Sequence, residues 1–144
     1  TAMARVPMED KRAFDRLERI VRKSCAQSAF SLTGNSGLIM FYLTKFMREN
    51  VYYGKEPDAF AVAQIEDRRL LLYDIFSENP VEPGRVIEAF GREIREVVMG
   101  FTPVDTTGFT AGKVQEEDTT LFVKGKGFKD FSRLGVRIPL LAYA

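Results

Sequence analysis

The sequence predicts an α+β domain in which a mixed, mainly antiparallel sheet carries helices on both of its faces. Two apolar runs, Ala59–Ile65 and Leu70–Phe76, are joined by four charged residues, a pattern typical of two antiparallel strands and a tight hairpin. Both sides of each run are apolar, so we expect both faces of this strand pair to be covered. Helical patterns before and after the pair supply the covering layers.

The length and composition fit one domain with its own core. The chain has 144 residues, of which 45% are hydrophobic and 28% charged, as in ordinary globular proteins. Its 21 basic and 20 acidic residues nearly cancel, so no overall charge attracts nucleic acid or an anionic membrane. We therefore expect a single domain over residues 1–144, with residues 1–9 flexible or a tag, and neither nucleic acid nor membrane as a partner.

Two residue counts limit the chemistry. The single cysteine, Cys25, excludes an intramolecular disulfide. The N-terminus also lacks the apolar stretch of a signal peptide. From these two observations we expect a cytoplasmic location. The chain has no histidine, which removes the commonest general base near neutral pH and every zinc site that contains histidine. No acidic cluster has a spacing suited to metal binding, so we expect no metal cofactor.

The N-terminal part of the chain predicts two helices and a strand. Apolar side chains recur at helical spacing over residues 10–23, and residues 38–48 form a second helix that is apolar on nearly all sides. The small and polar stretch 24–37 forms a loop between them. Residues 51–53 form a short strand before the central pair, which makes three antiparallel strands in a row.

The first predicted helix carries a row of basic side chains, which we name the basic ridge. Its members, Arg12, Arg16, Arg19 and Lys23, follow one another at spacings of four, three and four, so they share one side of the helix. A phosphate-rich ligand or RNA could use such a ridge. A solvated helix face is the simpler interpretation, because no aromatic residue lies between the basic ones to stack on a base.

The C-terminal half predicts a helix and further strands. A helix runs from Pro83 to about Arg92, and its start, beside Gly84 and Arg85, offers backbone N–H groups that could bind an anion or simply begin an ordinary helix. Residues 96–102 form the fourth strand, parallel to the third because a helix connects them. We also expect a loop or ragged strand over 104–115, a strand over 119–124, a short helix over 128–134 and an apolar tail, 138–141, that contacts the body.

One residue of the third strand differs from its surroundings. Asp74 is a carboxylate in an otherwise apolar strand, and buried acids need a partner, so it is a candidate functional residue or a structural carboxylate satisfied by backbone or arginine. Strict alternation along this strand places Leu70 and Leu72 on one face and Tyr73 and Ile75 on the other.

The order of these elements resembles the GCN5-related N-acetyltransferase (GNAT) family with its first strand missing. The strings DAFAVAQIEDRRLLLYDIFS, VVMGFTP and EEDTTLFVKG are similar to the C-terminal part of a group of bacterial members. The resemblance covers about residues 10–144. It implies a GNAT-like fold and an acyl-CoA-dependent N-acyltransferase with acetyl-CoA as donor and a small-molecule or peptide amine as acceptor.

The resemblance also implies a site where the third strand parts from the fourth. Backbone groups of the third strand hold the thioester and the pantetheine arm, and the following loop and helix start hold the pyrophosphate. If the domain is catalytic, the amine is deprotonated by water or by an acid such as Asp74 with a raised pKa, which makes Asp74 the candidate catalytic residue. The residues so implied for the donor are Leu72, Tyr73, Ile75, Phe76, Ser77, Gly84 and Arg85.

This chain departs from the family pattern in two places. The usual Arg/Gln-x-x-Gly-x-Gly/Ala phosphate loop is absent and only Gly84 remains, and residues 103–112 replace a helix that normally carries a tyrosine acid. These departures favour the alternative, a catalytically degenerate GNAT-like domain that serves as a structural or dimerisation module of a larger acetyltransferase. The sequence leaves open whether the chain forms a homodimer.

Overall fold

A computed structural model describes residues 2–24, 36–101 and 103 of the chain. The elements in these ranges are, in chain order, β1 (Met3–Arg5), α1 (Lys11–Lys23), α2 (Ser36–Lys45), the 3₁₀ turn η1 (Arg48–Asn50), β2 (Val51–Gly54), β3 (Ala59–Glu66), β4 (Arg69–Phe76), α3 (Pro83–Phe90) and β5 (Glu96–Met99).

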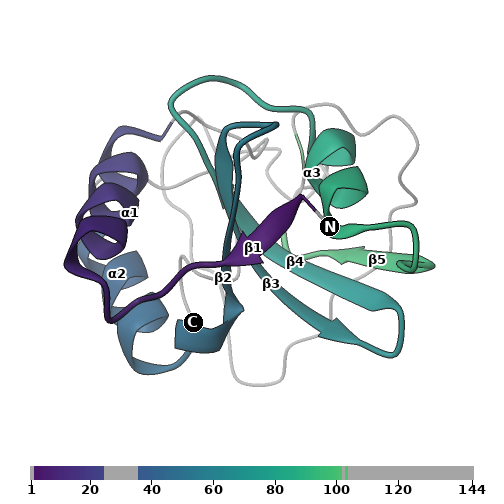
Figure 1. Ribbon diagram of the computed structural model, residues 1–144, viewed down its shortest axis with the longest axis horizontal. Coiled ribbons are helices and arrows are strands. Elements are labelled where there is room, and N and C mark those ends of the chain that lie inside the picture. The colour runs from purple at the N-terminus through teal and green to yellow at the C-terminus, as the bar shows by residue number, and fades with distance from the viewer. Residues whose placement is uncertain (1, 25–35, 102, 104–144) are drawn as a thin grey trace, which may run out of the picture.

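The five described strands form one sheet in the order β1-β2-β3-β4-β5 (Figure 1). Neighbouring strands are antiparallel up to β4, and β4 pairs with β5 in parallel. A parallel neighbour requires a crossover connection, and α3 provides it. The prediction of a mixed, mainly antiparallel sheet is confirmed.

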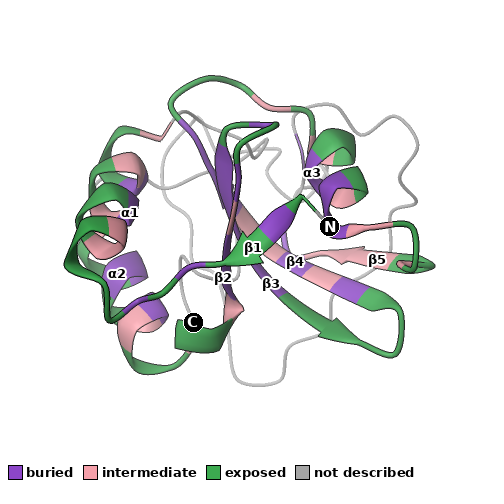
Figure 2. Cartoon of the chain, viewed as in Figure 1, coloured by how far each residue is buried: buried purple, intermediate pink, exposed green. Residues whose placement is uncertain are grey.

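Helices cover both faces of this sheet, so the chain has two hydrophobic cores (Figures 1 and 2). We name the two sides the α1–α2 face and the α3 face. On the α1–α2 face Leu17 and Leu43 are fully buried against Val62 of β3. On the α3 face Val86 and Phe90 are buried against the opposite side of the strands. The expected covering of both faces is confirmed.

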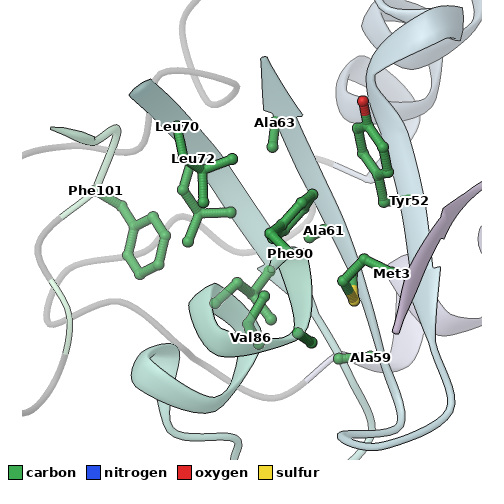
Figure 3. Packing of buried hydrophobic residues seen from close by; sticks show 12 residues of the cluster. Met3, Tyr52, Ala59, Ala61, Ala63, Leu70, Leu72, Val86, Phe90 and Phe101 are labelled. Carbon is green, nitrogen blue, oxygen red and sulfur yellow. The ribbon is translucent and has the colours of Figure 1, made fainter. Parts of the chain in front are cut away.

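Small side chains on β3 allow α3 to approach the sheet closely (Figure 3). Ala59, Ala61 and Ala63 are at most 1% exposed and lie in one cluster with Phe90. The Phe90 ring meets the Tyr52 ring edge to face, with 5.1 Å between ring centroids. Large residues on α3 and β2 thus fill the space that the alanines leave.

The hairpin between β3 and β4 has the tight connection that the sequence predicted. Its two central residues, Asp67 and Arg68, have φ values of 47° and 66°. Positive φ at both positions defines the type I′ turn, whose twist matches that of the two strands.

The start of α1 is capped by a side chain. The Asp10 carboxylate accepts hydrogen bonds from the N–H groups of Arg12 and Ala13.

The N-terminal residues correct two expectations. We expected the first strand to be missing and residues 1–9 to be flexible or a tag, whereas Met3–Arg5 form β1 and pair with β2. Met3 is 4% exposed on the α3 face, and the Ala2 N–H donates to the Ala89 carbonyl at 2.9 Å. A strand of three residues is too short to show an alternating pattern in the sequence, which is why we missed it.

Other expected boundaries move by a few residues. The second helix covers Ser36–Lys45 instead of 38–48, and β5 covers Glu96–Met99 instead of 96–102. The elements expected at 104–115, 119–124 and 128–134, and the tail at 138–141, lie outside the described residues.

If β1 belongs to the fold, shortening its buried side chain must cost stability. We expect Met3→Ala to lower the free energy of unfolding by about 2 kcal/mol, because it leaves a cavity on the α3 face. The neighbouring exposed change Ala4→Ser should alter it by less than about 0.5 kcal/mol. Urea denaturation of both variants measures the difference, and equal stability of the two would contradict the docking of β1.

Candidate functional site

The central hairpin contains a β-bulge at Tyr73. Val62 of β3 lies opposite Asp74, whereas the next residue, Ala63, lies opposite Leu72. Tyr73 is therefore one extra residue in β4 with no counterpart in β3. A bulge of this kind bends its strand, increases the local twist and changes the direction in which the following side chains point.

The bulge changes which face each residue of β4 occupies. We expected Ile75 on the same face as Tyr73, and this was wrong: Ile75 is buried on the α3 face with Leu70 and Leu72. Tyr73 and Phe76 contact the core of the α1–α2 face instead. One inserted residue shifts an alternation of period two by one step, so every residue after it changes face.

The pairing of β4 with β5 ends just before this bulge. Their parallel pairing runs from Arg69 beside Glu96 to Leu72 beside Met99, and the Gly100 N–H then donates to the Leu72 carbonyl at 2.7 Å. Beyond this bond, none of the described strands continues beside Tyr73–Phe76 on the β5 side. We name the region beside Tyr73–Phe76 the wedge.

Asp74 lies at the wedge and faces the α1–α2 side. Opposite residues of an antiparallel pair share a face, and Asp74 opposes Val62, which is buried in the α1–α2 core. One carboxylate oxygen, Oδ1, accepts a hydrogen bond from the Ile75 N–H at 2.8 Å. Asp74 forms no salt bridge within the described residues.

The surroundings of Asp74 favour the neutral acid. Burial raises the pKa of Asp74 to about 7, and the hydrogen bond from Ile75 lowers it by a smaller amount. A carboxyl group with this pKa is present in both protonation states near neutral pH, so it can accept and return a proton.

The other residues that the resemblance implied for the donor fall into two groups. Leu72, Tyr73, Ile75, Phe76 and Ser77 follow one another along the end of β4, but the Leu72 carbonyl is already used by Gly100. Gly84 and Arg85 are exposed in the first turn of α3. A Cβ at Gly84 would meet no atom within 4 Å, so the backbone there is open to solvent.

Ser77 is held in place instead of being free to bind a ligand. It is 2% exposed, its N–H donates to the Ser24 hydroxyl at 3.1 Å, and its own hydroxyl donates to the Asn79 carbonyl at 2.5 Å. These bonds join the end of α1 to the segment after β4. Ser77 is therefore a fixed part of the segment after β4, and its role in binding the donor stays a prediction.

Sequence reasoning missed two features of this region. It could not place the bulge at Tyr73, because residues 70–76 are apolar on both faces apart from Asp74, so no alternation of polar and apolar residues marks where the register shifts. It also missed a cavity of about 160 Å³ between α1, the start of β3 and residues 77–79. The basic ridge was the available signal for the cavity, since Arg16 and Arg19 line it.

The described residues therefore define an α+β domain in which the β4–β5 pairing ends at a bulged strand that carries a half-buried acid. Comparison of the chain with protein-family models, with curated proteins and with solved structures found no match. In the described ranges, no three His, Cys, Asp or Glu side chains are grouped so as to hold a metal ion. None of the helices there has the length and apolar character needed to cross a membrane.

Because the pKa of Asp74 is raised, its contribution to the stability of the folded protein falls as the pH rises. The folded protein holds this proton more tightly than the unfolded chain, so the stabilisation by the neutral acid is complete below about pH 4 and is lost as the pH rises through about 7. We expect the stability of the wild type to fall relative to Asp74→Asn over this range. Chemical denaturation of both proteins at pH 4.5 and pH 8 measures the difference, and a constant difference would contradict the burial of the acid.

Proposed function

We propose that the protein is an acyl-CoA-dependent N-acyltransferase with a GNAT-like fold that transfers an acetyl group to an amine. The observation that carries this proposal is the end of the β4–β5 pairing after Leu72, beside the bulge that precedes Asp74. An extended amide-containing arm can lie along the end of β4, which has no neighbouring strand on the β5 side among the described residues, because an edge strand offers backbone groups to such an arm.

The proposed reaction is a direct transfer without a covalent enzyme intermediate. The amine nitrogen attacks the thioester carbonyl, a C–N bond forms and the C–S bond breaks. The ionised Asp74 carboxylate takes the proton that the amine loses, and the neutral acid returns it to the departing thiolate. A pKa near 7 suits both steps, because the group is then a usable base and a usable acid near neutral pH.

The position of Asp74 favours an acceptor that approaches from the α1–α2 face. The acid shares that face with Val62, and the opposite face at this level is filled by Ile75 and the α3 core. The chemical class that we infer for the acceptor is an amine, in a small molecule or a peptide.

The second candidate is a catalytically degenerate GNAT-like domain with a structural or dimerisation role. It is favoured by two observations: residues 77–82, between β4 and α3, contain no glycine, and the Leu72 carbonyl of β4 is already paired with Gly100. The two candidates differ in whether the domain binds the donor, which a binding measurement decides.

Binding of the donor should stabilise the folded protein. At a concentration of acetyl-CoA one hundred times its Kd, the free energy of unfolding rises by about 2.7 kcal/mol through mass action. Thermal unfolding with acetyl-CoA up to millimolar concentration measures this shift. No shift at any concentration would favour the degenerate domain.

Removing the Asp74 carboxylate should lower kcat but should affect acetyl-CoA binding much less. We expect Asp74→Asn to lower kcat by about 10²-fold or more while acetyl-CoA still stabilises the variant, because an amide cannot accept the proton. Glu66→Gln, the same change at an exposed position of β3, is the matched control and should retain activity. Acetylation of a panel of amines, followed by release of the free thiol, measures kcat. Equal rates in the two variants would remove Asp74 from the mechanism.

A further inference from the structure

The cavity beside the end of β4 is built from three parts of the chain. Arg16 and Arg19 of α1 form one side, Asp58 and Phe60 at the start of β3 form the second, and residues 77–79 form the third. The third side has a defined shape, because Ser77 is buried and hydrogen bonded to Ser24 and to Asn79. None of these groups has a part in the proton transfers proposed above.

Arg16 is fixed in this cavity by its neighbours. Its guanidinium donates to the Tyr53 hydroxyl at 2.7 Å, lies 3.4 Å from Asp58 Oδ1, and is 4.3 Å from the centre of the Tyr53 ring. The Tyr53 hydroxyl in turn donates to Asp58 Oδ1 at 2.7 Å. The charge of Asp58 is therefore balanced by Arg16, and both side chains are held in one arrangement.

Arg19 carries a positive charge that the Arg16, Tyr53 and Asp58 side chains do not neutralise. Its guanidinium forms no salt bridge with the described residues, although it lines the same cavity. The helix that carries it has six basic and two acidic residues, so the surroundings add to the positive potential. Glu78 is the one lining acid without a salt bridge among the described residues, and it is exposed.

The cavity residues 77–79 follow Asp74 by three to five positions along the chain. Asp74 and the cavity residue Phe60 are both on the α1–α2 face, and Glu78 is four residues beyond Asp74. The pantetheine arm has about a dozen bonds, which corresponds to about four residues of extended backbone. An extended arm that follows the chain from a thioester beside Asp74 would therefore reach residues 77–79 with its phosphate groups.

We propose that Arg19, beside the fixed Arg16, binds phosphate groups of the acyl-CoA donor in this cavity and replaces the missing glycine-rich phosphate loop. This inference rests on the proposed function for the identity of the ligand. Arginine suits the role, because its planar group donates two parallel hydrogen bonds to phosphate oxygens. Of the basic ridge, Arg16 and Arg19 line the cavity, whereas Arg12 does not.

The test compares two variants that remove the same charge from the same helix. Arg19→Gln removes the cavity arginine and Arg12→Gln removes a ridge arginine that does not line the cavity. Isothermal titration with acetyl-CoA, S-acetylpantetheine and adenosine 3′,5′-bisphosphate separates the phosphate-bearing part of the donor from the arm. We expect Arg19→Gln to weaken acetyl-CoA binding about tenfold and Arg12→Gln less than twofold, with S-acetylpantetheine binding unchanged in both. Glu78→Gln should strengthen acetyl-CoA binding.

The outcomes separate this inference from the proposed function. Equal weakening by the two arginine variants, or equal affinity of the wild type for acetyl-CoA and S-acetylpantetheine, would overturn the phosphate site and leave the acyltransferase proposal intact. Binding of adenosine 3′,5′-bisphosphate that depends on Arg19, without binding of either thioester, would retain the anion site and reject the acyl-CoA ligand. If the wild type binds none of the three probes, both proposals are wrong.

Discussion

The arrangement of this domain depends on one extra residue in its central strand. Tyr73 has no counterpart in β3, and the pairing on its two sides can be satisfied only if the strand bulges there. As a result Ile75 enters the α3 core and Phe76 the α1–α2 core, each less than 6% exposed. Both cores hold the bulge in place, because removing it would move these two large side chains to the wrong faces.

The same constraint explains why an acid is tolerated at position 74. The bulge places Asp74 where its carboxylate reaches the N–H of the following residue, which satisfies one oxygen without a cation. Burial nevertheless favours the neutral form, so the position costs stability at neutral pH and above. A purely structural role would be served as well by asparagine. A group that changes protonation near pH 7, beside the point where the β4–β5 pairing of the described residues ends, supports the proposed role in proton transfer.

Much of the fold could be predicted from the sequence because its elements have strong periodic signals. The helix at Lys11–Lys23, the hairpin at residues 66–69 and the parallel partner after α3 all follow from spacing, turn residues and connection length. Three features could not be predicted. The strand Met3–Arg5 is too short to show a period. The bulge leaves no mark in a strand that is apolar on both faces apart from Asp74, and the cavity forms only when α1 meets residues 77–79. Asp74 was identified because its chemistry differs from that of its neighbours, whereas the face it occupies depends on the bulge.

The proposed donor site requires that hydrogen bonding between β4 and β5 stops at Leu72. NMR couplings transmitted across backbone hydrogen bonds test this most directly. We expect a coupling between the Gly100 N–H and the Leu72 carbonyl. We expect no hydrogen-bond coupling between Tyr73–Phe76 and the residues after Gly100. Couplings that continue from Asp74 and Ile75 into the segment after Gly100 would show an unbroken ladder. Such a ladder would close the wedge and contradict the proposed binding of the donor.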